Sequence, residues 1–157
     1  MKKLKNPFAE LSSYKCFGCS PNNDHGLKLE FYEDGDEIVS TWEPDPCFQG
    51  YTNVLHGGIQ STLMDEIASW VVFVKLKTGG VTSRLTCRFR KPVMVNQGPI
   101  TLRAKLVEQR RNLAEIEVKL FNSEGVLCAE SVAEYFILSK EKARESMAFP
   151  DPDAFYK

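Results

Sequence analysis

Residues 55–77 read LHGGIQSTLMDEIASWVVFVKLK, and the apolar spacing in this stretch decides the fold. From Gly58 to about Lys77, large apolar residues recur every three or four positions, which is the period of an α-helix. They are Ile59, Leu63, Ile67, Trp70, Val71 and Val74. The second half is apolar on nearly all sides, so we expect other structure to enclose it. The sequence TGG at 78–80 is predicted to end the helix.

The periodic segments outside this helix have the alternation of β-strands, in which every second residue is apolar. Two precede the helix and four follow it, joined mostly by short turn sequences such as NSEG at 122–125. The expected strands are 27–32, 37–43, 81–90, 99–109, 113–121 and 125–138. Within 81–90, alternation places Leu85 and Phe89 on one face and Thr82 and Arg88 on the other.

One helix cannot cover both faces of such an antiparallel sheet. The simplest arrangement is an α+β fold in which the sheet curls around the helix and buries one face against it. The remaining sheet edge invites pairing with a second copy of the chain. We therefore expect one domain at 27–140, an N-terminal segment at 1–26, and a tail at 141–157 that forms a short helix or a loosely held end.

The composition excludes some classes of function. The chain has 20 Lys and Arg against 21 Asp and Glu, for a net charge of -1, which argues against non-specific nucleic-acid binding. We expect no membrane segment, because no apolar run approaches the length of a span. The 5 cysteines are odd in number and irregularly spaced, which favours a reducing, cytoplasmic location over a secreted disulfide framework.

Three motifs carry a resemblance to a known family: CFGCSPNNDHGLKLEFY at 16–32, FQGYTNVLHGGIQSTLMDE at 48–66 and VTSRLTCRFRKPV at 81–93. With this order of elements, the chain resembles the hotdog-fold thioesterases over roughly residues 16–138. Within them it is similar to the phenylacetate-pathway-like (PaaI-type) acyl-CoA thioesterases. The resemblance implies a hotdog fold, with an antiparallel sheet of about six strands wrapped around one long central helix, in a homodimer or a homotetramer built as a dimer of dimers.

The resemblance also implies a catalytic centre at the start of the helix. Thioester hydrolysis puts negative charge on the former carbonyl oxygen, which unpaired N–H groups at a helix N-terminus can stabilise. The Gly57 N–H is the expected main donor, and Asp65 is the acid that attacks the thioester or activates water, with Glu66 as the fallback. His56 either donates to the departing thiolate or holds the loop. Thr82 is expected to hold the acid or the water, reaching the site from the opposite subunit.

Each of these residues also has a plain structural interpretation. The two glycines can make a tight turn, Asp65 can be a solvated carboxylate, and Thr82 can be an ordinary strand residue. A carboxylate on a helix enclosed by a sheet, however, has to meet a ligand, a cleft or a partner chain. We therefore favour the catalytic interpretation of Asp65.

Less distinct sequence signals mark the substrate-binding residues. Some relatives have an asparagine six residues before the histidine, where this chain has Gly50. Gln49 or Asn53 is the expected substitute amide, and Gly58 extends the glycine turn. The acyl specificity depends on how aromatic residues pack beside the site, namely Phe48, Tyr51, Trp70 and Phe73.

Basic residues line one face of the segment 81–90. Arg88 and Arg90 are the candidates for binding the phosphates of coenzyme A, because guanidinium groups match phosphate geometry. A solvated outer sheet face, balanced by Glu115 and Glu117, is the alternative.

Cys16 and Cys19 have the C-x-x-C spacing of half a zinc site, with His25 nearby. No second matched pair follows, since Cys47, Cys87 and Cys128 are isolated. A metal-free structural segment is therefore favoured, and a zinc site is the alternative.

Together these features predict a cytoplasmic acyl-CoA or related thioester hydrolase that needs no metal and no cofactor besides the coenzyme A of its substrate. A non-catalytic acyl-CoA-binding or regulatory protein of the same fold is the alternative. A dehydratase or hydratase is disfavoured, because its usual histidine and glutamate motif is missing.

Overall fold

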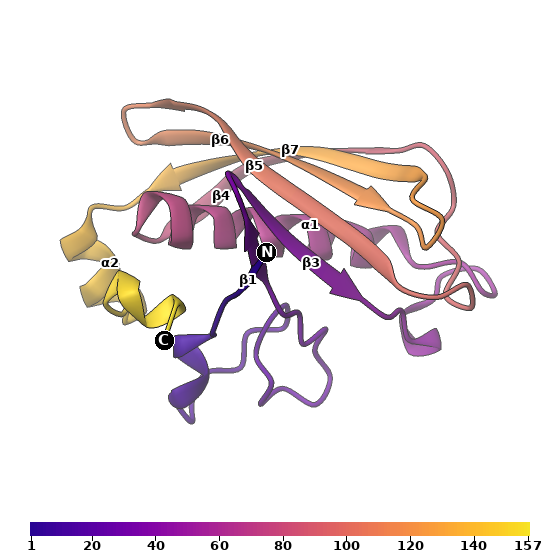
Figure 1. Ribbon diagram of the computed structural model, residues 1–157, viewed down its shortest axis with the longest axis horizontal. Coiled ribbons are helices and arrows are strands. Elements are labelled where there is room, and N and C mark those ends of the chain that lie inside the picture. The colour runs from indigo at the N-terminus through magenta and orange to yellow at the C-terminus, as the bar shows by residue number, and fades with distance from the viewer.

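In the computed structural model, which describes residues 1–157, one antiparallel sheet curves over one long helix (Figure 1). The sheet has seven strands in the order β1-β2-β3-β5-β6-β7-β4. Their bounds are β1 (Lys2–Lys3), β2 (Tyr32–Asp34), β3 (Glu37–Trp42), β4 (Gly80–Phe89), β5 (Ile100–Arg110), β6 (Leu113–Phe121) and β7 (Leu127–Ile137). The wrapped arrangement expected from the sequence is confirmed, with the two-residue strand β1 as an addition.

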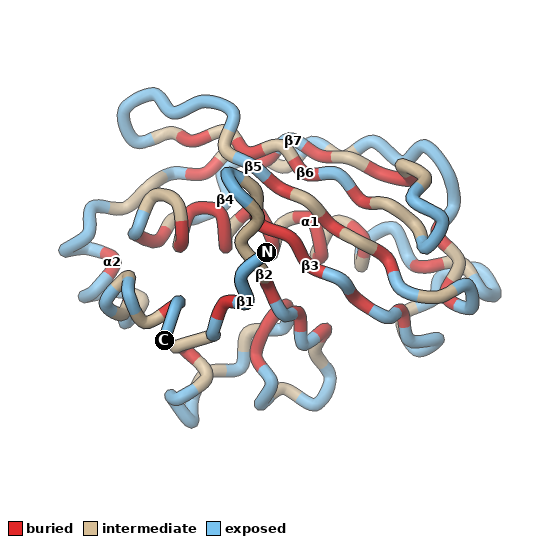
Figure 2. The backbone as a smooth tube through the Cα atoms, in the orientation of Figure 1, coloured by how far each residue is buried: buried red, intermediate tan, exposed pale blue.

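Helix α1 spans Gly57–Val71 and continues as a π-helical turn at Val72–Leu76. His56 caps its N-terminus, because the imidazole Nδ1 accepts a hydrogen bond from the Gly58 N–H at 2.9 Å. The helix ends one residue earlier than the TGG sequence predicts, since Lys77 already adopts a left-handed conformation with φ of 59°. Five of the strands contact α1, and the buried residues gather along it and along the facing strands (Figure 2).

Strand β4 contains the irregularity that matters most for the site. It pairs only with β7 and forms one edge of the sheet. Its register shifts between Thr82 and Arg84, which inserts Ser83 as a β-bulge. Because a bulge reverses the alternation, Thr82 shares the helix-facing side with Leu85, opposite the prediction made from strict alternation. The prediction failed because period-two reasoning assumes an unbroken ladder.

The segment 27–32 also differs from the expected strand. Leu27, Leu29 and Phe31 are buried at alternate positions, but the ladder begins only at Tyr32. Lys28 has a positive φ of 55°, and the Leu27 and Leu29 N–H groups donate to carbonyls in the loop at 17–18. The segment therefore packs as expected but pairs with the N-terminal loop instead of a strand.

The tail forms helix α2 (Lys140–Met147) and a short 3-10 turn (Pro152–Phe155), and it is firmly packed. Phe155 has no exposed surface and contacts an aromatic cluster beside α1 that contains Phe8, Trp70, Phe73 and Phe149. The N-terminal segment and the tail lie on the side of α1 away from the sheet (Figure 1). The expectation of a loosely held end is therefore wrong, while the short helix is confirmed.

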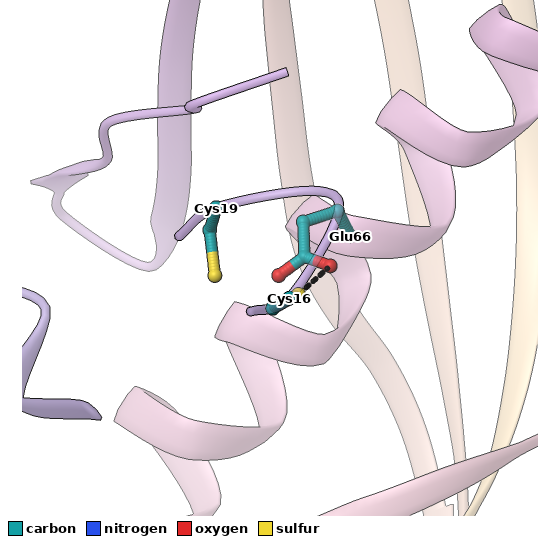
Figure 3. A group of neighbouring side chains, drawn as sticks. All are labelled: Cys16, Cys19 and Glu66. Atoms are coloured by element: carbon teal, nitrogen blue, oxygen red, sulfur yellow. Dashed lines mark hydrogen bonds between the residues drawn. The ribbon is translucent and has the colours of Figure 1, made fainter. Parts of the chain in front are cut away.

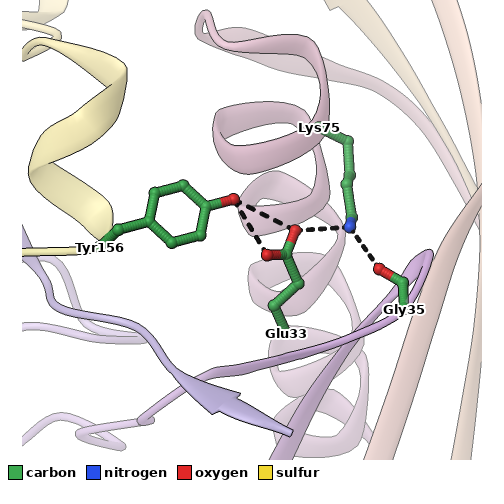
Figure 4. Close-up of polar contacts among 4 residues, drawn as sticks. All are labelled: Glu33, Gly35, Lys75 and Tyr156. Carbon is green, nitrogen blue, oxygen red and sulfur yellow. Dashed lines mark hydrogen bonds and ion pairs between the residues drawn. The ribbon is translucent and has the colours of Figure 1, made fainter.

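A polar cluster closes this packing at the surface (Figure 4). The Tyr156 hydroxyl donates to Glu33 Oε1 at 3.0 Å, and Lys75 Nζ lies 2.5 Å from Glu33 Oε2. The same ammonium group donates to the Gly35 carbonyl at 2.7 Å. The tail, the β2–β3 turn and the end of α1 are thus joined by one carboxylate.

No helix in the structure combines the length and apolar character required to cross a membrane.

Candidate active site

Asp65 lies in the middle of α1, beneath the strands β4 and β7. Its Oδ1 accepts hydrogen bonds from the Thr82 hydroxyl at 2.9 Å and from the Tyr135 hydroxyl at 2.7 Å. No hydrogen bond within the chain involves the second carboxylate oxygen, Oδ2. Two hydroxyl donors therefore fix the orientation of the carboxylate and leave one oxygen for a ligand or a water molecule.

Tyr135 is the site residue that the sequence did not reveal. Its side chain is 2% exposed, and its hydroxyl also lies 2.8 Å from the Asp65 carbonyl oxygen. Burial, and then the negative charge of Asp65, raise the pKa of Tyr135 far above its usual value, so the phenol stays protonated as a donor. In the sequence it is one more inward residue of an alternating strand, and only the fold brings it to Asp65.

The contact between Thr82 and Asp65 lies within one chain, whereas the family resemblance led us to expect Thr82 from the opposite subunit. The bulge at Ser83 explains the geometry, because it turns the Thr82 side chain toward α1. Thr82 therefore holds the Asp65 carboxylate of its own chain.

The glycine turn at the start of α1 offers one free N–H group. The Gly58 N–H donates to His56 Nδ1, while the Gly57 N–H has no acceptor within the chain. Because Nδ1 of His56 is an acceptor, the imidazole proton is assigned to Nε2, which can donate to a ligand. A Cβ on Gly58 would lie 3.0 Å from the imidazole ring, so a side chain there would crowd the capping histidine.

A cleft with a volume of about 670 Å³ opens beside this turn. His56, Gly57 and Gln60 line it from α1 and its cap, and Phe89, Arg90 and Lys91 line it from the end of β4. The Gly57 N–H therefore lies in a cleft large enough for an organic ligand, with two cationic side chains at the rim.

The expected substitute amides do not line this cleft. The Gln49 side chain accepts a hydrogen bond from the Asn53 N–H at 2.9 Å and so closes its own loop. Asn53 adopts a positive φ of 65° in that loop, and the Gly50 backbone lines the cleft beside His56. Neither amide side chain lines the cleft. The loop instead contributes Gly50, Tyr51, Val54 and Leu55 to it, and Tyr51 is 87% exposed.

The two arginines predicted to bind phosphate have different positions. Arg90 lines the cleft and forms an ion pair with Glu130 at 2.5 Å, whereas Arg88 does not line it. Arg88 is paired in register with Glu130 and lies on the outer sheet face. Lys91, which continues the predicted basic face beyond Arg90, forms no ion pair and also lines the cleft.

Glu66, the fallback acid, points to the other side of the helix. Its Oε1 accepts a hydrogen bond from the Cys16 thiol at 3.4 Å, beneath the N-terminal segment (Figure 3). Burial raises the pKa of Glu66 to about 8. Its carboxylate meets Cys16 and not the Thr82 and Tyr135 hydroxyls, so the structure separates it from the Asp65 carboxylate.

Gly57 and Asp65 are also separated along α1. Eight residues of helix correspond to roughly 12 Å along the axis. Reacting groups have to lie within about 3–3.5 Å of each other. The Gly57 N–H and the Asp65 carboxylate of one chain therefore cannot both touch the same thioester group.

Comparison with known proteins points to a family. The model of the family described as "Thioesterase superfamily" matches residues 52–129, which include the glycine turn, Asp65 and Thr82. "Putative esterase Ta0293" from Thermoplasma acidophilum is 25% identical over 87 residues. That match covers 54% of this chain and 64% of the relative, so it spans less than two thirds of that protein.

Solved structures show the same fold. Thioesterase HI1161 from Haemophilus influenzae is 25% identical with a TM-score of 0.69, over 77% of this chain and 85% of that one. A hypothetical thioesterase protein from Streptococcus pneumoniae, solved with coenzyme A, is 25% identical with a TM-score of 0.66, over 71% of this chain and 87% of that one. This chain has the hotdog fold, and its residues 52–129 match the thioesterase superfamily.

Proposed function

We propose that the protein hydrolyses an acyl-CoA or a related thioester to the acid and the thiol. The observation that carries this proposal is the Asp65 carboxylate, held through Oδ1 by two hydroxyls and free at Oδ2. Such a carboxylate can attack the thioester carbonyl or take a proton from an attacking water molecule. The Gly57 N–H stabilises the oxyanion, and the departing thiolate takes a proton from water, while the Nε2–H of His56 can donate a hydrogen bond to it.

The similarity to a solved structure that contains coenzyme A supports a CoA thioester as the substrate. In the cleft, Arg90 and Lys91 are the cationic groups suited to the phosphates of coenzyme A, and Phe89 and the backbone of Gly50 border the path to the Gly57 N–H. We assign this role to Lys91 more than to Arg88, because Arg88 lies on the outer face. We also propose that the protein belongs to the PaaI-type branch of the acyl-CoA thioesterases.

The active unit that we propose is a homodimer, because one chain cannot complete the site. Strand β4 is a ten-residue edge strand whose side chains are mostly exposed, and such an edge favours strand pairing. At one end of β4, Thr82 touches Asp65, and at the other, Phe89 lies beside Gly57. Antiparallel pairing of β4 with its copy, centred near Leu85 and Thr86, would bring each Asp65 to the Gly57 of the partner subunit.

The first experiment measures the release of free thiol from a panel of acyl-CoAs, for the wild type and for Asp65→Asn. We expect turnover by the wild type on at least one member and a loss of about 10³-fold in the variant. Binding of acyl-CoA without turnover of any member would replace the enzyme by a non-catalytic binding protein. Retained activity in Asp65→Asn would remove Asp65 from the mechanism.

The second experiment tests the composite site by mixing two inactive variants. Asp65→Asn lacks the acid, and Gly57→Val fills the cleft, where a Cβ meets only the Phe89 ring at 3.9 Å. A mixed dimer has one site with both native groups, so partial denaturation and joint refolding should restore activity. If the site were built within one chain, mixing would restore nothing. Each variant refolded alone is the control.

A further inference from the structure

Cys16, Cys19 and Glu66 converge beside α1 (Figure 3). None of the three contacts the hydroxyls that hold Asp65. Each offers one donor atom, and the three donor atoms lie within 4.8 Å of one another. The Cys16 thiol is 3.4 Å from Glu66 Oε1. The proposed thioester hydrolysis uses none of these groups, so the cluster needs its own explanation.

The backbone of the N-terminal loop is folded to present the two thiols. The Ser20 N–H donates to the Cys16 carbonyl at 3.0 Å, and the Asn6 side chain donates to the Cys19 carbonyl at 3.1 Å. Gly18 lies between the cysteines, where a Cβ would overlap the Glu66 carboxylate. A residue with a side chain at this position would push the carboxylate away, so glycine is what allows the three donors to meet.

The cluster also lacks a positive charge. Glu66 takes part in no ion pair, and the hydrogen bond from the Cys16 thiol is the contact that its carboxylate receives. The other neighbour is the Tyr14 hydroxyl, which lies 3.0 Å from the Cys19 sulfur. Burying an ionised carboxylate in this way costs free energy unless a cation or a proton neutralises its charge.

We propose that Cys16, Cys19 and Glu66 bind one Zn²⁺ ion. Two thiolates and one carboxylate are a donor set that suits zinc, whereas Mg²⁺ and Ca²⁺ prefer oxygen alone. Binding releases the two thiol protons to solvent, together with the proton that Glu66 carries when its carboxyl is neutral, and the ion then offsets two of the three negative charges. A water molecule or the Tyr14 oxygen completes the tetrahedral set.

The position of the cluster defines the role of the ion. Cys16 and Cys19 come from the N-terminal loop, while Glu66 follows the proposed catalytic acid in α1. The ion would tie the loop to the centre of the helix, and it would stabilise the fold without touching the substrate. His25, which the sequence suggested as a ligand, is exposed and outside the cluster.

The test uses the reduced, full-length protein after treatment with a chelator, and Co²⁺ as a spectroscopic probe for zinc. We expect one Co²⁺ per chain, with the visible bands of tetrahedral cobalt and the near-ultraviolet charge-transfer band of thiolate ligands, and displacement of both by Zn²⁺. Cys16→Ser and Cys19→Ser should each remove the thiolate band or weaken binding at least about 10-fold, and Glu66→Gln should weaken it by a similar factor.

Cys47→Ser is the matched control, because Cys47 is an exposed free thiol outside the cluster. It should bind Co²⁺ like the wild type and show the same rise in Tm on addition of Zn²⁺. Circular dichroism checks that each variant is folded, and Glu66→Gln tests the site if a cysteine variant fails to fold.

Absence of stoichiometric Co²⁺ binding by the folded wild type would overturn the proposal, as would equal loss in Cys47→Ser. A Cys16–Cys19 disulfide that persists in the reduced preparation, detected by mass, would also overturn it and make the pair a redox element.

Discussion

Asp65 and Glu66 are neighbours in the sequence, yet they lie in two different environments. Consecutive helix residues point about 100° apart, so one carboxylate faces the sheet and the other faces the N-terminal loop. Asp65 receives two hydroxyl hydrogen bonds and keeps one oxygen free, whereas Glu66 meets two thiols and burial raises its pKa to about 8.

The difference extends to the two sides of the helix. The sheet side carries polar groups that are held in place, which suits the hydrolysis proposed at a homodimer interface. The other side is filled by the N-terminal segment, the tail and their aromatic rings, which suits stability. An acid at one position can therefore serve the reaction while its neighbour serves the structure.

The strongest test of the different roles of Asp65 and Glu66 is to neutralise each acid in turn. Asp65→Asn should lower kcat about 10³-fold, equivalent to about 4 kcal/mol of barrier, with little change in Tm. Glu66→Gln should leave kcat within about 3-fold of the wild type, because its side chain faces Cys16 in the N-terminal loop and not the hydroxyls that hold Asp65. Thiol release and thermal melts measure both quantities. A larger loss of kcat in Glu66→Gln than in Asp65→Asn would reverse the assignment.

Substitutions on the packed side of α1, which the N-terminal segment and the tail cover, should change the stability of the fold and not the rate of the reaction. Phe155→Ala removes a ring with no exposed surface and should lower the free energy of unfolding by about 3–5 kcal/mol. Urea denaturation measures the change, and kcat should stay near the wild-type value wherever the variant is folded. Val107→Ala is the control, since Val107 is 52% exposed and its truncation should cost within about 0.5 kcal/mol. Equal costs in the two variants would contradict the packing described for the tail.

The two hydroxyls that donate to Asp65 provide a further test of its role on the sheet side of α1. Tyr135→Phe removes a hydrogen bond to a charged group, worth about 1.5–3 kcal/mol, so kcat/KM should fall about 10- to 100-fold. Thr82→Val should have a smaller effect of the same kind, because its hydroxyl is exposed to water.

The control for this pair is Ser83→Ala, whose hydroxyl bonds Glu134 on the outer face. It should leave kcat/KM unchanged. The double variant of Tyr135 and Thr82 should lose less than the product of the single losses, because both hydroxyls hold the same oxygen. Full additivity would mean that the two residues act independently of Asp65.

The sequence predicted the central helix and most of the strands because their patterns are local. The spacing of Leu63, Ile67, Trp70 and Val74 repeats every turn, and a period of that kind needs no knowledge of distant residues. The glycine turn and Asp65 lie in this same stretch, so the proposed site could also be located from it. Their catalytic roles stay predictions until turnover is measured.

The sequence could not predict the contacts that depend on distant residues. Tyr135 meets Asp65 across 70 positions, and Cys16 meets Glu66 across 50. The bulge at Ser83 is another case, since inserting one residue leaves no periodic mark and yet reverses the face on which Thr82 lies. These features follow from strand pairing, which a pattern within one segment does not report.

The smallest expected effect concerns the polar cluster at the end of the packed side. Tyr156→Phe should cost about 0.5–1 kcal/mol of unfolding free energy, because Glu33 keeps Lys75 and water as partners. Burial and the hydrogen bond to Glu33 raise the pKa of Tyr156 from 10.0 to about 12. Since the folded chain then retains the proton more tightly, this contribution is present below pH 10 and is lost as the pH rises toward 12. Urea denaturation of the wild type and Tyr156→Phe should therefore differ at pH 8 and converge at high pH. A double-mutant cycle with Glu33→Gln should find most of the difference in that one pair, and a gap that stayed constant with pH would assign it to packing of the ring instead.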